Sequence, residues 1–422
     1  MSKTHIQVDG ERFLINGKLT YSEIEGSNPN THGLLMNARF IQGIFDDKAN
    51  PERFARFGKE VFDPEENTDA LIAALPEWYS YGLRAFTVGL QGGGPVFTVD
   101  DLTTIHNTPF SEDGKSFDQA YEGRLERLIR AADEIGMIVI VSFLYQGQAH
   151  RLKDGRAVRN AVKTACAVLR NINRSNVIIE VANEHDIGNF KLHPIVHSAE
   201  GAAYLVELAR EQSGGIPVGC SGGGGHTNRE LADASDVILI HGNGCTRQEF
   251  YKMIKRIRAW GMNKPIVCNE DSPCIGQLEV AYRNYASWGY YNNLTKQEPP
   301  ADWRVTPGED SFFARRMAEG IGIKLPPIPF EEQYYLQGFE PEMTVDKKRW
   351  IRLASLYPES INYVEFYKNG KLVDIAYDEP FMVNSETTWI QSPCYISHED
   401  KEWKAVVHLR NGEIIEKTVT LG

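Results

Sequence analysis

The stretch Val177-Ile-Ile-Glu-Val-Ala-Asn-Glu184 decides the fold class of this 422-residue chain. It is an apolar, β-branched run of strand length that ends in an Asn-Glu pair. A second stretch, Lys264-Pro-Ile-Val-Cys-Asn-Glu270, has the same pattern. Continuous apolar runs are typical of parallel strands that helices cover on both faces. The two stretches therefore predict a parallel sheet in which two strands end at a carboxylate.

Similar strand-like runs alternate with helix-like stretches along most of the chain. The expected strands lie within residues 35–45, 84–90, 137–144, 177–182, 216–220, 237–240, 265–268 and 287–291. The expected helices are residues 68–81, 117–135, 156–171, 200–212, 228–234, 246–260, 275–285 and 311–321. Eight such strands favour an α/β fold of the closed (β/α)8 TIM barrel type over an open doubly wound sheet.

The two ends of the chain have a different, hairpin-like pattern. Residues 12–21 predict a β-hairpin around Asn16-Gly17, and Asn369-Gly370 and Asn411-Gly412 each separate two strand-like runs near the C-terminus. Residues 296–341 are expected to be a long loop region with one helix. We therefore expect a barrel with an N-terminal hairpin over residues 1–349, and a small C-terminal all-β sandwich domain over residues 350–422.

The amino-acid composition limits the kinds of molecule that this protein is expected to bind. Hydrophobic residues make up 42% and charged residues 24%, which is ordinary for a soluble globular protein. The net charge of -12 makes nucleic acid an unfavourable partner, and no segment has the ~18 uninterrupted apolar residues that span a membrane. The N-terminus has no apolar signal region, so a cytoplasmic location is expected. The six cysteines lack a CxxC pair and are expected to be buried free thiols.

The two strand-ending carboxylates are the candidate catalytic groups. Glu184 and Glu270 end the fourth and seventh expected strands, which face each other across a barrel mouth, and barrel enzymes carry their chemistry at this end of the strands. A facing pair of carboxylates is the minimum needed to hydrolyse a glycosidic bond. Taken singly, Glu184 could cap a turn or pair with Arg174, and Glu270 could be a surface acid. Their joint placement favours catalysis.

Polar and aromatic residues at the other strand ends are candidate substrate-binding groups. Asn183 could bind a sugar hydroxyl, and His241 could hydrogen-bond Glu270 and hold it ionised. Aromatic rings at a barrel mouth offer flat apolar platforms for a sugar face. The candidate binding residues are Asn183, His241, Trp288, Gln91, Tyr145 and Tyr290.

These motifs resemble those of a known group of enzymes. The motif ending at Glu184 resembles the strand-four motif of clan A glycoside hydrolases, particularly the family 5 (cellulase-like) pattern apolar-Glu-x-x-Asn-Glu. The motif ending at Glu270 resembles their strand-seven nucleophile motif, and His241 and Trp288 lie where that clan often has these residue types. The resemblance covers about residues 12–291. It implies retaining hydrolysis, with Glu184 as acid/base, Glu270 as nucleophile, and neither cofactor nor metal.

Outside those motifs the resemblance is looser. Thr87 stands where family 5 has a strand-two arginine, and the C-terminal segment resembles immunoglobulin-like modules attached to glycosidases. We expect a retaining glycoside hydrolase that cleaves a β-linked oligo- or polysaccharide. One alternative is a non-catalytic carbohydrate-binding barrel, which the missing arginine leaves open. Another is a metal-dependent TIM-barrel hydrolase or isomerase, with ligands drawn from His185, Asp186, His226, His241 and Glu270.

Overall fold

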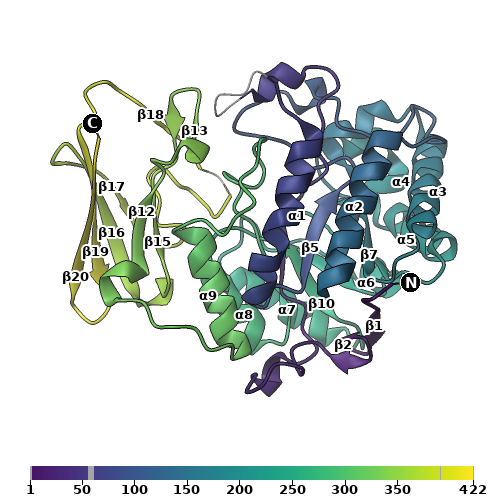
Figure 1. Cartoon of the computed structure of the whole chain (residues 1–422), viewed down its shortest axis with the longest axis horizontal. Helices are drawn as coiled ribbons and strands as arrows, with labels where there is room; N and C mark the ends of the chain where they lie inside the picture. Colours follow the sequence, from purple (N-terminus) through teal and green to yellow (C-terminus); the bar gives the residue numbers. More distant parts are fainter. Residues whose placement is uncertain (1, 56–60, 390, 422) are drawn as a thin grey trace.

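The computed structural model describes residues 2–55, 61–389 and 391–421, and combines an α/β portion with a β-rich portion formed by the C-terminal part of the chain (Figure 1). The chain begins with three antiparallel strands, β1 (Ile6–Asp9), β2 (Arg12–Ile15) and β3 (Lys18–Leu19). The turn between β2 and β3 is Asn16-Gly17, both with positive φ, as the hairpin prediction requires.

The strands of the α/β portion coincide with the eight that the sequence predicts. Six of them form a parallel sheet in the order β11-β4-β5-β6-β7-β8, and β9 pairs in parallel with β10. Their bounds are β4 (Asn37–Arg39), β5 (Ala85–Gly89), β6 (Ile138–Tyr145), β7 (Val177–Asn183), β8 (Val218–Gly219), β9 (Ile238–His241), β10 (Ile266–Glu270) and β11 (Gly289–Tyr290).

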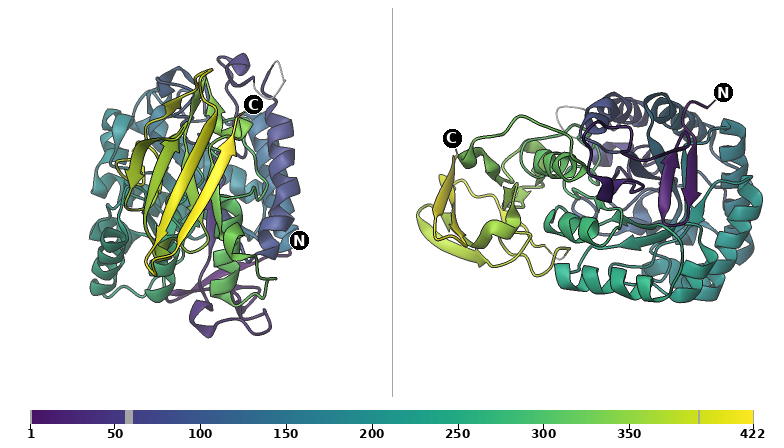
Figure 2. Two further views of the ribbon diagram at one scale, coloured as in Figure 1. Left: turned by 90° about the vertical axis from the view of Figure 1, so that its left-hand side faces the viewer. Right: turned by 90° about the horizontal axis from the view of Figure 1, so that it is seen from below.

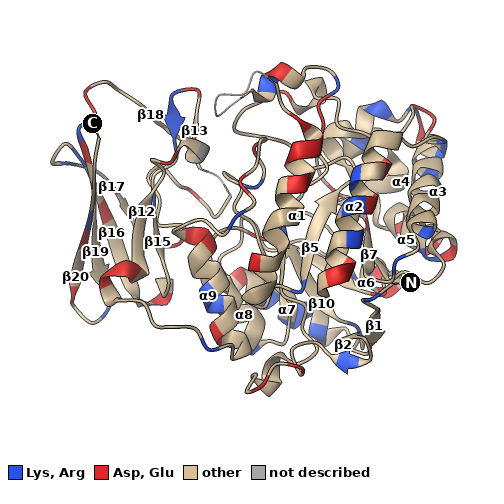
Figure 3. Cartoon of the chain, in the orientation of Figure 1, with Lys and Arg blue, Asp and Glu red and all other residues tan. Residues whose placement is uncertain are grey.

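Helices surround these strands (Figure 2). They are α1 (Pro64–Ser80), α2 (Gln119–Ile135), α3 (Gly155–Ile172), α4 (Pro194–His197), α5 (Ala199–Ser213), α6 (Arg229–Ala234), α7 (Arg247–Ala259), α8 (Gly276–Arg283) and α9 (Glu309–Ile321). Asp63, Asp118 and Asp154 cap α1, α2 and α3, each accepting two backbone N–H groups. Acidic and basic residues both occur on α2 and α9 (Figure 3). No described helix is long and apolar enough to cross a membrane.

Within the part of the chain that the structure describes, an isolated bridge links the two groups of strands. Val267 of β10 pairs in parallel with Ser287, just before β11. Among the described residues no ladder joins β8 to β9, although the Asp236 N–H donates to the Val218 carbonyl at 2.7 Å. The observed arrangement is a six-stranded parallel sheet in a mixed α/β fold, consistent with a TIM-barrel-like architecture. The closed barrel stays a prediction.

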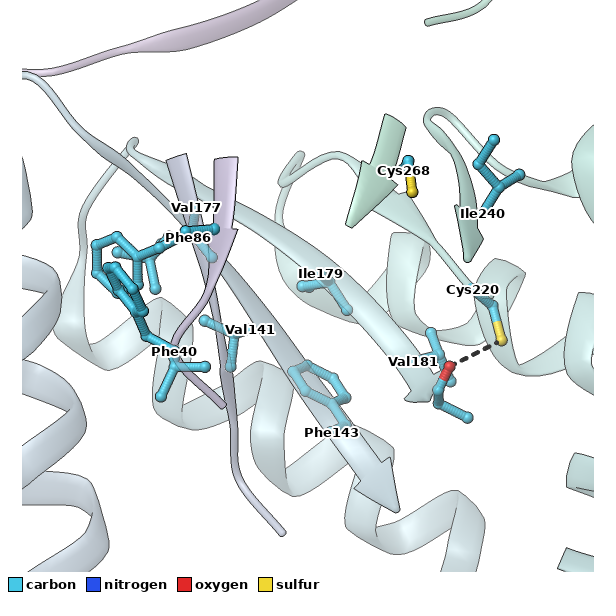
Figure 4. Close-up of a cluster of buried hydrophobic side chains, with 14 of the residues drawn as sticks. Phe40, Phe86, Val141, Phe143, Val177, Ile179, Val181, Cys220, Ile240 and Cys268 are labelled. Carbon is cyan, nitrogen blue, oxygen red and sulfur yellow. Dashed lines mark hydrogen bonds between the residues drawn. The ribbon is translucent and has the colours of Figure 1, made fainter. Parts of the chain in front are cut away.

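Alternate residues of a strand face different cores. Ile179 and Val181 of β7 belong to the large core between strands and helices (Figure 4). Ile178 belongs instead to a smaller cluster enclosed by the strands, which also contains Phe13 of β2. Because side chains two apart in a strand point to the same side, Glu180 shares the enclosed side with Ile178. The N-terminal hairpin therefore packs over one end of the strands, and β7 presents a carboxylate between them.

The C-terminal strands are antiparallel. A four-stranded sheet has the order β17-β16-β19-β20, and two hairpins within it have the predicted Asn-Gly turns. The strands concerned are β16 (Ile361–Lys368), β17 (Lys371–Ala376), β19 (Glu402–Leu409) and β20 (Ile414–Thr420). A small three-stranded sheet contains β13 (Thr344–Val345), β14 (Lys348–Arg349) and β18 (Cys394–Tyr395).

Among the strands that the sequence prediction missed, one lies in the region expected to be a loop. The expected loop region 296–341 contains β12 (Tyr334–Gln337), which pairs with β15 (Arg352–Ser355). Leu336 of β12 and Trp403 of β19 lie in one hydrophobic cluster, so β12 contributes to the core of the β-rich portion. A C-terminal all-β domain is consistent with these contacts, whereas its boundary at residue 350 stays a prediction.

The cysteines match the expectation of free thiols. All six are unpaired, and Cys394 is the one that is partly exposed. Cys220, just after β8, lies in the main core, where its thiol donates to the Ala182 carbonyl at 3.4 Å (Figure 4).

Candidate active site

Glu184, His241 and Glu270 meet at the carboxyl ends of β7, β9 and β10. Nδ1 of His241 lies 3.0 Å from Oε1 of Glu184 and 3.4 Å from Oε2 of Glu270. One carboxylate oxygen of Glu184 lies within 4.8 Å of a carboxylate oxygen of Glu270. The two glutamate side chains are only 11% and 6% exposed. The residues predicted to be catalytic therefore form one nearly enclosed cluster with His241.

The backbone at Glu184 adopts a conformation that residues with a side chain rarely take. Its φ is 55°, in the left-handed region, which costs on the order of 1–3 kcal/mol. Ser221 holds this turn: its hydroxyl accepts the Glu184 N–H at 3.1 Å, and its carbonyl accepts the His185 N–H at 3.0 Å. The turn carries the Glu184 carboxylate back toward His241.

Arg39, which the sequence analysis missed, is the main counter-ion of Glu270. It is the last residue of β4, and its Nε lies 2.9 Å from Oε2 of Glu270. A second arginine nitrogen donates to Oδ1 of Asn183 at 2.5 Å. Asn243 donates to the other Glu270 oxygen, Oε1, at 3.2 Å. A cation and an amide donor thus flank Glu270, and Arg39 also orients Asn183.

A third carboxylate lies beneath the pair. Glu180 is fully buried, accepts hydrogen bonds from the Ser221 hydroxyl at 2.7 Å and from Asn269 at 3.0 Å, and lies 3.6 Å from Nε2 of His241. Burial alone raises the pKa of Glu180, but protonated His241, Arg39 and the Asn269 amide outweigh it and lower the pKa to about 2. Glu180 is therefore a permanent anion at neutral pH.

The charged groups of this cluster shift the pKa values of one another. Burial lowers the pKa of His241, yet the surrounding carboxylates, Glu270 foremost, raise it to about 10, so the ring is an imidazolium at neutral pH. Burial raises the pKa of Glu270 to about 6, although Arg39 and His241 oppose this rise. The cluster thus combines two cations with three carboxyl groups, counting Glu184.

Two predicted binding residues lie on the side of β5 and β6. Tyr145 is the last residue of β6, and burial raises its pKa to about 12, with a further contribution from the charge of Glu184. Gln91 is buried, accepts the Tyr145 N–H at 2.8 Å and donates to the Thr108 hydroxyl at 3.0 Å. Tyr145 is therefore near the carboxylates, whereas Gln91 positions its backbone.

The rings of Trp288 and Tyr290 are not open to a ligand. Both are almost completely buried, because Trp288 packs in the main core and Tyr290 stacks on Phe313 at 4.3 Å. The Trp288 indole N–H donates to Asp271 at 2.6 Å, which braces the residue that follows Glu270. In this structure Trp288 supports the site through its hydrogen bond to Asp271, and its ring has no exposed face for a sugar.

The ligands of the metal alternative are mostly engaged elsewhere. Nδ1 of His185 lies 3.1 Å from the Val196 carbonyl, and Asp186 accepts the Gly223 N–H at 2.8 Å. Glu184, His241 and Glu270 could each offer one ligand atom to an ion. However, Arg39 already pairs with Glu270, so a cation at this position would have to compete with its guanidinium.

Comparisons with known proteins identify the fold rather than a family. No protein-family model matches the sequence, and a search of curated proteins finds no significant match. Among solved structures, the chain resembles a Bacteroides vulgatus protein considered to be a glycoside hydrolase, with a TM-score of 0.52 and 10% identity over 99% of this chain and 80% of that one.

Two other similar structures are more distant. The Parabacteroides merdae β-glucuronidase has a TM-score of 0.44 and 10% identity, over 99% of this chain and 50% of that one. The endo-β-1,4-mannanase of Thermotoga petrophila has a TM-score of 0.45 and 12% identity, over 92% of this chain and 96% of that one. The chain therefore spans half the length of the β-glucuronidase. The likeness to the Bacteroides vulgatus protein shows that this chain shares the fold of that protein.

Proposed function

We propose that the protein is a retaining glycoside hydrolase that cleaves a β-linked saccharide through Glu184 and Glu270. The observation that carries this proposal is the approach of the two buried carboxylates, with oxygens within 4.8 Å of each other. Retaining glycosidases keep their carboxyl groups about 5–5.5 Å apart, whereas inverting enzymes need about 6.5–9.5 Å to admit a water. The short separation favours a covalent intermediate.

The two glutamates have different surroundings, which supports different roles. Glu270, flanked by Arg39 and Asn243, attacks the anomeric carbon and forms the glycosyl ester while the bond to the leaving oxygen breaks. Glu184 donates its proton to that oxygen. It then removes a proton from the water that hydrolyses the ester, which restores both residues. These steps require no cofactor.

The metal-dependent alternative has less support, because the Arg39–Glu270 ion pair opposes a cation at this position. Activity before and after treatment with a chelator distinguishes the two. The family 5 assignment, an immunoglobulin-like C-terminal domain, a cytoplasmic location and the binding roles of Gln91, Tyr145, Trp288 and Tyr290 stay predictions.

The decisive experiment assays a panel of nitrophenyl glycosides with the wild type, Glu184→Ala and Glu270→Ala. We expect about a 10²- to 10⁴-fold loss of kcat with Glu184→Ala, and at least as large a loss with Glu270→Ala. Glu207→Ala, at an exposed position of α5, is the matched control and should retain full activity.

The stereochemistry is tested separately. Azide can attack the glycosyl ester without a general base, so adding azide to Glu184→Ala should restore turnover and give a β-glycosyl azide. Hydrolysis that persists undiminished in both glutamate variants would show that the mechanism is wrong. An α-glycosyl azide would contradict retention.

A further inference from the structure

A cavity of about 800 Å³ is lined by residues that follow β9 and residues that follow β17. One wall is the loop that follows β9 together with the first turn of α7, including Gly244 and Gln248. The other wall belongs to the segment after β17, including Tyr377 and Thr388. Its volume is within the range of about 300–1,000 Å³ typical of small-molecule sites. The cavity thus lies between the α/β portion and the C-terminal strands.

The chain connects this cavity directly to the catalytic cluster. Asn243, which donates to Glu270, is followed by Gly244, which lines the cavity. The Gly244 N–H donates to the Thr388 hydroxyl on the opposite wall at 2.7 Å. The loop of Asn243 and Gly244 therefore contacts Glu270, the expected nucleophile, through one residue and lines the cavity through the next.

Aromatic rings extend from the rim of the cavity across the neighbouring sheet. Tyr377 is 66% exposed, and its ring centre lies 5.8 Å from that of Tyr363 on β16. Tyr363 in turn stacks on His408 of β19, with 4.2 Å between ring centres and 17° between planes. An exposed ring at the edge of a polar cavity, backed by two half-buried rings, suits a ligand that has apolar faces and polar edges, as pyranose rings do.

The polar lining mixes donors and acceptors. The charged lining residues are Arg247, Glu249, Asp378, Glu379, Glu386 and Arg410, so four acids stand against two bases. The excess of acids disfavours an anionic ligand, whereas hydroxyl groups can bond to side chains of either sign. A neutral, hydroxyl-rich chain fits this lining best.

We propose that this cavity and its Tyr377 rim bind a neutral polysaccharide chain at a distance from the bond that is cleaved. The direction of that chain, toward Glu184 and Glu270, rests on the proposed function. The binding itself does not, because it requires no hydrolysis. The site makes a saccharide of several units the preferred substrate.

The test is affinity electrophoresis of the full chain in native gels that contain galactomannan, xyloglucan, mixed-linkage β-glucan or arabinoxylan. The proteins are the wild type, Tyr377→Ala, and Tyr395→Ala as a control at a residue that is 70% exposed and outside the cavity lining. We expect at least one polysaccharide to retard the wild type and Tyr395→Ala alike. Tyr377→Ala should raise the apparent Kd about tenfold, the usual effect of removing an aromatic anchor.

Kinetics on defined substrates completes the test. With hexasaccharides of the polysaccharide that binds, Tyr377→Ala should lower kcat/KM about tenfold, while kcat/KM for a nitrophenyl monoglycoside stays unchanged. The proposal is overturned if none of the four polysaccharides retards the wild type, or if Tyr377→Ala and Tyr395→Ala are retarded equally. Retardation that depends on Tyr377 in a protein that hydrolyses no glycoside would support the binding site and refute the proposed function.

Discussion

At the scale of single residues, the proposed mechanism predicts that protonation of Glu270 limits activity on the acidic side. Its buried carboxyl group has a pKa raised to about 6, and only the ionised form can attack the anomeric carbon. We therefore expect kcat/KM for an aryl glycoside to fall as the pH drops through about 6, by about tenfold per pH unit below that value. A rate that stays constant down to pH 4.5 would contradict this assignment.

Arg39 should set the pH below which kcat/KM falls. Its positive charge opposes the rise in the pKa of Glu270, so Arg39→Met, which removes the charge, should move the acidic limit to higher pH. Arg39→Lys keeps a charge at nearly the same place and should shift the limit less. The measurement is the pH dependence of kcat/KM for all three proteins, together with their melting temperatures. Equal profiles for the two variants would show that Arg39 acts through packing instead of charge.

The meeting of Glu184 and Glu270 could be predicted from sequence because each glutamate ends an apolar, strand-like run. Arg39 and Glu180 give a weaker signal, namely a charged residue inside a run that is otherwise buried, which implies a buried partner without identifying it. Their partners are set by which strands lie close together, a property of the folded chain. The burial of the Trp288 ring could not be foreseen for a related reason, since sequence position at a strand end does not reveal whether a ring faces solvent or core.

At the scale of elements, long apolar runs were recognised and short or isolated strands were not. The strands β5, β6 and β7 match their predicted ranges within one residue at most ends, because each is a continuous buried run. β12 was missed because its four residues lie in a segment rich in proline and charge, and its pairing partner β15 follows only later in the chain. The local residue pattern of a strand does not reveal which later strand it will pair with.

The N-terminal hairpin should contribute substantially to stability through one side chain. Phe13 is fully buried in the cluster enclosed by the strands, so Phe13→Ala should lower the free energy of unfolding by about 3–5 kcal/mol. Chemical denaturation monitored by fluorescence measures the change. Phe330→Ala, at a residue that is 40% exposed, is the matched control and should cost about 1 kcal/mol or less. A similar loss in both variants would mean that the hairpin does not brace the strands.

At the scale of the whole molecule, several buried acids should make the protein less stable in mild alkali. Burial raises the pKa of Asp271 to about 8, and those of Glu309 and Glu379 to about 7. In the unfolded chain such groups titrate near pH 4, so between pH 6.5 and 8 the folded protein binds more protons than the unfolded one. The free energy of unfolding therefore falls as the pH rises through this window.

His241 acts in the same direction. Its folded pKa, raised to about 10, gives a stabilisation that is complete below about pH 6.5 and is lost as the pH rises toward 10. We expect the melting temperature to decrease from pH 6.5 to pH 8.5, and Asp271→Asn to make that decrease smaller. Asp100→Asn, at an exposed position, should leave the slope unchanged. A melting temperature that rises across this range would contradict the predicted linkage.

The presence of a protonated histidine among the carboxyl groups has a consequence for the whole reaction cycle. The proposed mechanism requires a resting state in which Arg39 and His241 balance the ionised Glu180 and Glu270, while Glu184 carries the proton that it will donate. In the covalent intermediate, esterification removes the charge of Glu270 at the step in which Glu184 gives up its proton. The formal charge of the enclosed cluster is zero in both states, so under the proposed mechanism the enzyme would pass through its cycle without placing an unbalanced charge in a low-dielectric interior.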